Sequence, residues 1–331
     1  MDTTTYVDYR DTSLRPAWPT LPAAVRAEVA RLAGAPVAMA DPVVTTGFTG
    51  SYAGVVTCAD GRRAFVKAGG ADMPHVVAAL RQEASVLAGL PRGIPAPTLV
   101  GSSAVEGWSV LVLEVVEGRM PGQPWTAPDV AAVVRACETI ARLTTPVASE
   151  TAPPSVGATM AADESVQATA RGLVDGTFTV TTAMPAMMAD RRADLGRLCL
   201  AAARRPELLA GDTLSHGDIR PDNLLVTGGD VRSCTVVDWN WVGSGAPWMD
   251  LVGLLPMMAA DGIDTEAILA ASPLTRAADP EALDAFLSII ACYMVTSVDQ
   301  PPPPGCTPAL RQHQRLMAQL FTDYVARRRG W

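Results

Sequence analysis

One stretch, S-H-G-D-I-R-P-D-N over 215–223, constrains the chain more than any other. It sets an acid, Asp218, five positions before an amide, Asn223. A short polar loop and an apolar, β-prone run over 235–237 follow, and the run ends in a second acid, Asp238. Such a run predicts a buried strand, which would return Asp238 to the side of Asn223. The spacing therefore predicts two carboxylates and an amide at one site.

This combination of side chains is typical of phosphoryl transfer. In that reaction one carboxylate takes the acceptor's proton, and an amide and a second carboxylate hold the metal ions that neutralise phosphate charge. Asp218 is the expected base, and Asn223 and Asp238 are the expected Mg²⁺ ligands. The alternative is an ordinary hairpin with acids in its turns. An isolated H-G-D would leave that alternative open, but the amide at its spacing and the returning V-V-D argue against it.

Composition excludes several classes of protein. The 331 residues are 49% hydrophobic and 18% charged, which provides for a large core and argues against disorder. The net charge of −8 argues against nucleic-acid binding and suits a cationic substrate, although it is equally explained by solubility. The six cysteines are scattered without metal spacing, which predicts reduced thiols and a cytoplasmic protein. We find no signal peptide and no apolar run long enough for a membrane span.

The first hundred residues contain a candidate loop for phosphates. Gly47, Gly50 and Ser51 lie in a turn between two β-prone runs, and glycines let a backbone approach phosphate oxygens closely. The spacing does not match G-x-G-x-x-G, so a plain hairpin turn stays open as an alternative. A G-x-x-x-x-G-K-[ST] motif is absent, which excludes a Walker-type site.

A buried ion pair is predicted beside this loop. Lys67 closes a β-prone run, and Glu83 falls on the apolar stripe of a helix predicted over 73–90. A carboxylate on the inward face of a helix is costly unless it is paired. Lys67 is the expected partner, and a surface position for Glu83 is the alternative.

The motifs together resemble one known family. His216-Gly217-Asp218, then Val237-Asp238-Trp239 and Asp250-Leu251, resemble the aminoglycoside phosphotransferase and choline kinase group, which shares the protein-kinase fold. Protein kinases have H-R-D and D-F-G at these places, so Gly217 and Trp239 depart from them. The resemblance implies an α+β, bilobal fold with an antiparallel sheet and one main helix in a small N-terminal lobe (1–117), and a larger helical lobe (118–331).

The resemblance also implies roles for individual residues. Lys67 would hold the nucleotide phosphates, and backbone groups of Glu114 and Val116 would pair with the base of ATP or GTP. Arg220 would stabilise transition-state charge, or else face solvent beside Asp222. His216 would anchor the catalytic loop, and Asp250 would brace it.

Further elements follow from periodicity and turn signals. Residues 1–20 are predicted as an irregular arm on the surface. Helices are predicted over 22–32, 127–143, 161–174, 186–204, 249–259, 264–271, 280–297 and 308–328. Strands are predicted over 43–46, 52–57, 63–67, 98–100, 109–116 and 224–226. His313 falls on the apolar stripe of the last helix and is predicted as a core histidine.

The resemblance also implies that the phosphate acceptor is a hydroxyl group of a small molecule. The leading expectation is an aminoglycoside-like or other antibiotic or natural product, and a sugar, amino sugar or amino alcohol of metabolism is the alternative. A catalytically silent nucleotide-binding module is a further alternative. Two groups of residues are candidates for the acceptor pocket: the acids Asp279, Glu281, Asp284 and Asp299, and the tryptophans Trp239, Trp241 and Trp248. The sequence does not indicate an oligomeric state.

Overall fold

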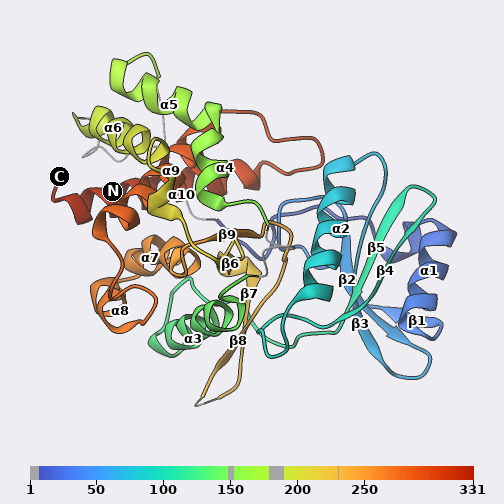
Figure 1. Cartoon of the computed structure of the whole chain (residues 1–331). Helices are drawn as coiled ribbons and strands as arrows, with labels where there is room; N and C mark the ends of the chain where they lie inside the picture. The colour runs from blue at the N-terminus through green and yellow to red at the C-terminus, as the bar shows by residue number, and fades with distance from the viewer. Residues whose placement is uncertain (1–6, 148–152, 179–189, 230) are drawn as a thin grey trace.

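The computed structural model describes residues 7–147, 153–178, 190–229 and 231–331. The chain forms two lobes, one built on a β-sheet and one built from helices (Figure 1). Within the described residues no helix is both long and apolar enough to cross a membrane.

The N-terminal lobe is a five-stranded antiparallel sheet with the order β1-β2-β3-β5-β4. Its strands are β1 (Val37–Ala40), β2 (Tyr52–Cys58), β3 (Arg63–Gly69), β4 (Leu99–Val105) and β5 (Trp108–Leu113). Helix α1 (Ala23–Ala33) covers one face and α2 (Pro74–Gly89) the other (Figure 1). Because side chains alternate along a strand, Val110 and Val112 pack toward α1 while Leu111 and Leu113 pack toward α2.

The C-terminal lobe is mostly helical and contains the larger core. Its helices are α3 (Ala127–Thr144), α4 (Val156–Ala162), α5 (Glu164–Asp175), α6 (Arg192–Ala203), α7 (Met249–Ala260), α8 (Thr265–Ala271), α9 (Pro280–Ser297) and α10 (Ala309–Arg329). Two small antiparallel sheets lie at the side that faces the first lobe. One pairs β6 (Thr213–Ser215) with β9 (Gly243–Gly245), and the other pairs β7 (Leu224–Thr227) with β8 (Ser233–Val236).

The predicted α+β, bilobal fold is therefore confirmed, and most predicted elements lie within a few residues of the observed ones. Three regions differ. The run 43–46 is not a strand, and the first strand, β1, lies earlier in the chain. The helix predicted over 161–174 is two helices, α4 and α5. Of the helix predicted over 186–204, residues 192–203 are helical, and 186–189 lie outside the described residues.

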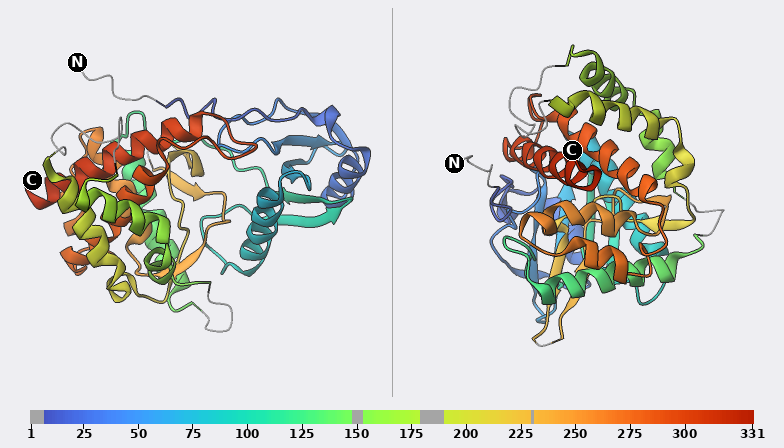
Figure 2. Two further views of the ribbon diagram at one scale, coloured as in Figure 1. Left: turned by 90° about the horizontal axis from the view of Figure 1, so that it is seen from above. Right: turned by 90° about the vertical axis from the view of Figure 1, so that its left-hand side faces the viewer.

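The predicted surface arm is the largest error. Within residues 7–15 the side chains of Val7, Tyr9, Thr12 and Ser13 are buried. The Tyr9 hydroxyl is 2.7 Å from Nδ1 of His313 in α10. Figure 2 shows this first part of the chain running beside the segment that leads into α10. The arm is thus packed between the two lobes.

Candidate active site

The S-H-G-D stretch forms a loop between β6 and β7 that Asp250 of α7 supports. The Asp250 carboxylate accepts hydrogen bonds from Ser215 Oγ (2.7 Å), His216 N (2.8 Å) and Gly217 N (3.2 Å). Gly217 has a φ of 78°, and a Cβ there would lie 2.3 Å from the carbonyl oxygen of Trp241. Glycine is therefore the residue that this turn accepts.

His216 is fully buried under the same loop. Its Nε2 donates to the Val237 carbonyl at 3.0 Å, and its Nδ1 accepts from the backbone N–H of Asp218 at 3.3 Å. Its ring also packs edge to face against the Trp239 ring, with the two ring centroids 4.8 Å apart. These contacts suit a residue that anchors a loop, and burial lowers its pKa.

Asp218 lies between a cation and an amide. Arg220 Nη1 is 2.9 Å from its carboxylate, and Asn223 Nδ2 donates to Asp218 Oδ2 at 3.2 Å. Burial raises the pKa of Asp218 to about 7, although the Arg220 charge opposes this shift. Arg220 also donates to Asp222 at 2.8 Å and has only 16% of its side chain exposed. The predicted pairing of Arg220 with Asp222 is therefore present, but the prediction that this arginine faces solvent is wrong.

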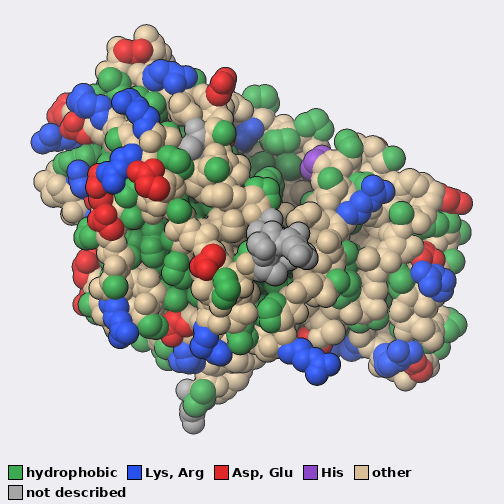
Figure 3. Space-filling view, viewed as in Figure 1, with side chains coloured by type: hydrophobic (Ala, Val, Ile, Leu, Met, Phe, Trp, Pro, Cys, Tyr) green, Lys and Arg blue, Asp and Glu red, His purple; other side chains and the backbone are tan. Residues whose placement is uncertain are grey.

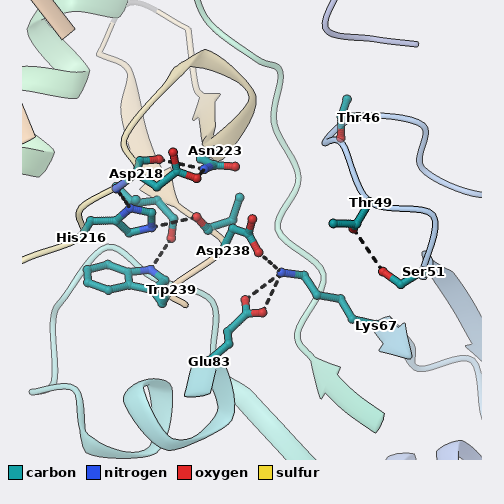
Figure 4. A network of polar contacts seen from close by, with 12 residues as sticks. Thr46, Thr49, Ser51, Lys67, Glu83, His216, Asp218, Asn223, Asp238 and Trp239 are labelled. Carbon is teal, nitrogen blue, oxygen red and sulfur yellow. Dashed lines mark hydrogen bonds and ion pairs between the residues drawn. The ribbon is translucent and has the colours of Figure 1, made fainter. Parts of the chain in front are cut away.

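Asp238 follows β8 and meets the N-terminal lobe across the site (Figure 4). Its Oδ1 accepts from Lys67 Nζ at 2.6 Å. Burial opposes its ionisation, but the attraction of Lys67 outweighs burial and lowers the pKa of Asp238 to about 2. Its φ of 71° is unusual for a residue with a side chain. Strain of this kind is concentrated at functional sites.

The ion pair predicted from the helix stripe is present. Lys67 Nζ on β3 lies 2.8 Å from both carboxylate oxygens of Glu83 on α2 (Figure 4). Glu83 has no exposed surface. Burial disfavours the charged ammonium, but Asp238 and Glu83 outweigh it and raise the pKa of Lys67. The two carboxylates therefore keep Lys67 charged at neutral pH.

The side chains of Asn223 and Asp238 suit a hard divalent cation. The Asn223 side chain donates from Nδ2 to the backbone carbonyl and to the carboxylate of Asp218, which leaves its own carbonyl oxygen as a ligand. Carboxylate and amide oxygens are the donors that Mg²⁺ prefers, usually together with phosphate oxygens. The described residues hold no cluster of three or more His, Cys, Asp or Glu side chains that could bind a metal alone. The donor set therefore fits a metal that arrives with a phosphate.

The glycine loop (residues 46–51) lies opposite these groups. Figure 4 shows Thr49 and Ser51 across a gap from Asp238 and Asn223. The Thr49 and Ser51 hydroxyls are 3.3 Å apart. On the outer surface, the molecule is hollowed between the two lobes (Figure 3).

The segment after β5 joins the lobes. The Glu114 N–H donates to the Thr98 carbonyl at 3.0 Å. The N–H of Glu114 is therefore occupied. Its carbonyl and the backbone groups of Val116 are left for a nucleotide base. The side chain of Glu114 is exposed.

The residues suggested for an acceptor pocket mostly have other partners. Asp284 is buried and pairs with Arg328 and Arg329, Glu281 pairs with Arg205, and Asp279 caps α9. Trp239 and Trp248 are buried in the core. Trp241 is 68% exposed, and its Cβ lies beside Gly217 in the catalytic loop. Of the three tryptophans, Trp241 is the one best placed to contact an acceptor.

Two residues at the site were missed by the sequence analysis. Phe48, in the glycine loop, is buried, and Arg220 lies over its ring at 4.9 Å. Arg15, in the arm, donates to the carbonyls of Thr46 and Ser51. Neither residue belongs to a motif, and the glycine spacing was the one sequence signal near Phe48.

Solved structures share the fold at low sequence identity. Aminoglycoside phosphotransferase APH(4)-Ia, as a thermostable mutant in complex with AMP-PNP and hygromycin B, has a TM-score of 0.59 and 14% identity, covering 93% of this chain and 99% of that one. Spectinomycin phosphotransferase APH(9)-Ia, with ADP and spectinomycin, has a TM-score of 0.52 and 12% identity, covering 88% and 90%. A protein described as a candidate fructosamine-3-kinase from Thermobifida fusca has a TM-score of 0.51 and 20% identity, covering 89% and 98%. These likenesses confirm the kinase-like fold.

No curated protein matches the chain. A family model does match it, over residues 55–286, and is described as the phosphotransferase enzyme family. The match includes Lys67, the catalytic loop and Asp250, and it confirms the family resemblance that the motifs predicted. The chain belongs to the phosphotransferase enzyme family.

Proposed function

We propose that the protein transfers the γ-phosphoryl group of a nucleoside triphosphate, with Mg²⁺, to a hydroxyl of a small molecule. The observation that carries the proposal is the convergence of Lys67, Asp218, Asn223 and Asp238 on one gap between the lobes (Figure 4). The family match and the relatives that contain AMP-PNP or ADP support it. The presence of every one of these four residues argues against a catalytically silent module.

Each charged group has a role in this proposal. Asp218 orients and deprotonates the acceptor hydroxyl, because a base with a pKa of about 7 accepts a proton at neutral pH. Lys67, fixed by Glu83, contacts the phosphates. Asn223 and Asp238 hold the metal, which when bound neutralises charge on the phosphate oxygens.

Other residues support the reacting groups. Arg220 lies 2.9 Å from Asp218 and supplies positive charge where the phosphoryl group passes. His216 and Asp250 hold the catalytic loop in shape. Gly47, Gly50 and Ser51 cover the phosphates, and the backbone of Glu114 and Val116 binds the nucleotide base. Backbone contacts do not distinguish ATP from GTP.

For the acceptor we propose an aminoglycoside-like or other antibiotic or natural product. The relatives with hygromycin B and spectinomycin support this class at the level of the fold. A sugar, amino sugar or amino alcohol of metabolism is the second candidate, supported by the relative described as a fructosamine-3-kinase. The exposed ring of Trp241 beside the catalytic loop suits the apolar face of a sugar ring in either class.

The test is release of ADP or GDP from Mg-ATP or Mg-GTP against a panel of acceptors. The panel contains aminoglycosides, peptide antibiotics, macrolides, hexoses, amino sugars and choline. Asp218→Asn should keep nucleotide binding and lower turnover on the order of 10²–10⁴-fold, the usual contribution of a general base. Asp212→Asn, at an exposed acid near the loop, is the matched control and should act like the wild type. Turnover that persists in Asp218→Asn would contradict the proposed mechanism.

A further inference from the structure

The glycine loop is held from two sides by segments outside the catalytic motifs. From the arm, the backbone N–H groups of Thr12 and Ser13 both donate to the Thr45 carbonyl at 2.9 Å. From the connector before α10, the Gly305 carbonyl accepts from the Gly50 N–H at 2.7 Å, and Thr49 forms a β-bridge with Cys306. A loop that closes over a substrate thus has fixed neighbours on both sides.

Arg15 joins the two ends of the loop through one guanidinium group. Its Nη1 donates to the Ser51 carbonyl at 2.6 Å, and its Nη2 donates to the Thr46 carbonyl at 2.7 Å. The planar fork of arginine matches two acceptors at once, whereas the single ammonium of lysine does not. A Cβ at Gly47 would lie 3.1 Å from Arg15 Nη2, so the glycine makes room for the guanidinium.

The charge of Arg15 also acts at the site. Burial lowers its pKa to about 10, while Asp238, on the opposite wall, raises it. The guanidinium therefore remains charged at neutral pH, and it lies directly behind the loop that faces Asp238 and Lys67.

The arm has anchors that do not involve Arg15. Tyr9 bonds His313, Gln123 Nε2 donates to the Val7 carbonyl at 2.7 Å, and Thr12 bonds Thr45. Removal of the Arg15 side chain should therefore free the loop and leave the arm attached. This separates an effect on the loop from a general loss of structure.

We infer that Arg15 is a positioning residue that holds the glycine loop in the shape which receives the phosphates of the nucleotide. The inference rests on the proposed function, since it assigns the loop to a nucleoside triphosphate. Thr49 and Ser51 then present their hydroxyls from a loop of fixed curvature, and Arg15 adds positive charge behind it. The base of the nucleotide, bound at the other end of the site, makes no contact that depends on Arg15.

The test compares Arg15→Met and Arg15→Lys with Arg10→Met in the full chain. Arg10 lies on the same arm and is exposed, so its substitution is the matched control. Calorimetry gives the Kd of Mg-ATP and of adenosine for each variant, and thermal unfolding checks the fold. Arg15→Met should raise the Kd of Mg-ATP on the order of tenfold or more, as expected for the loss of charged hydrogen bonds. Adenosine affinity should not change, and Arg15→Lys should lie between Arg15→Met and the wild type.

Three results of the binding measurements would overturn the inference. These are unchanged Mg-ATP affinity in Arg15→Met, an equal loss of adenosine affinity, or an Arg15→Lys variant that matches the wild type. Amide hydrogen exchange tests the same inference without nucleotide. In Arg15→Met, exchange should rise within residues 46–51 and stay unchanged in residues 8–13. Unchanged exchange in the loop would also overturn the inference. If the wild type binds no nucleotide, the proposed function fails and the phosphate role fails with it, while exchange still shows whether Arg15 holds the loop.

Discussion

Lys67 Nζ lies 2.6 Å from Asp238 Oδ1, although 171 residues separate the two along the chain. The pair joins β3 of the sheet lobe directly to the segment that follows β8 in the helical lobe. The same ammonium contacts both oxygens of Glu83. One cation thus connects the two lobes and compensates two carboxylates, and the following predictions begin with it.

Lys67→Met should destabilise the protein by about 3–5 kcal/mol, because it leaves the fully buried Glu83 carboxylate without its partner. The double variant Lys67→Met/Glu83→Gln should recover part of this loss, since it removes the fully buried carboxylate but leaves Asp238 without the cation. Urea unfolding of the two single variants and the double variant measures the coupling. Additive losses in the double variant would contradict a buried ion pair.

Gly217→Ala should abolish turnover and lower the free energy of unfolding by more than about 2 kcal/mol, because a Cβ would meet the Trp241 carbonyl in a left-handed backbone. Gly61→Ala is the matched control. Gly61 has a φ of 84°, but its Cβ would meet nothing within 4 Å. That variant should cost only about 1–2 kcal/mol and keep turnover. Thermal unfolding and the turnover assay check both, and equal effects would refute the role of the close contact.

Asp250→Asn should lower kcat on the order of 100-fold, because the catalytic loop loses one of its two acceptor oxygens and Asp218 shifts from its place. The Kd for nucleotide should remain within about twofold, since the hydrogen bonds of Asp250 go to Ser215, His216 and Gly217 and not to Lys67. Ser215→Ala removes one of the three hydrogen bonds and should have a smaller effect. A change in nucleotide Kd as large as the change in kcat would contradict this separation.

The contribution of His313 to the stability of the protein should fall as the pH drops below 6.5. Burial, aided by the Arg220 charge, lowers the pKa of His313 well below 6.5. Below pH 6.5 the unfolded chain therefore binds a proton that the folded protein does not, and this favours unfolding by up to about 1.4 kcal/mol per pH unit. Below the folded pKa of His313 both states carry the proton, and the dependence ends.

Urea unfolding between pH 5 and 7.5 measures this dependence. His313→Gln should make it less steep over that range, because glutamine does not titrate, while the buried His216 keeps its own contribution. His75→Gln, at an exposed position of α2, is the control and should keep the wild-type slope. An unchanged slope in His313→Gln would show that other groups cause the acid sensitivity.

Local sequence signals were sufficient for most elements and for the charged groups of the site. The stripe of α2 placed Glu83 inward, and Lys67 at the end of the neighbouring β-prone run was the expected cation to neutralise it. The spacing from Asp218 to Asn223 fixes a short loop, so those two side chains meet wherever the loop lies. These contacts depend on residues close in sequence or on a strong energetic requirement, and both kinds of information are present in the chain.

The arm could not be predicted, because its contacts are made with distant parts of the chain. Nothing in residues 7–15 has a helical or strand period, so the local pattern indicated a surface segment. The run 43–46 failed as a strand for a related reason. The Thr45 carbonyl accepts from Thr12 and Ser13 in the arm, while the Val44 N–H donates to the Ala53 carbonyl of β2, so the run divides its backbone hydrogen bonds between two partners. Burial of Tyr9 likewise requires His313, which no local signal connects to it.

The contact between Tyr9 and His313 bridges 304 positions of the chain. During synthesis the arm leaves the ribosome long before its partner, while the catalytic loop at 215–223 emerges between them. A nascent chain with every catalytic motif already outside the ribosome therefore still lacks the helix that fixes the arm. The glycine loop depends on the arm and on the connector before α10, so it gains its final shape only when the last helix has folded.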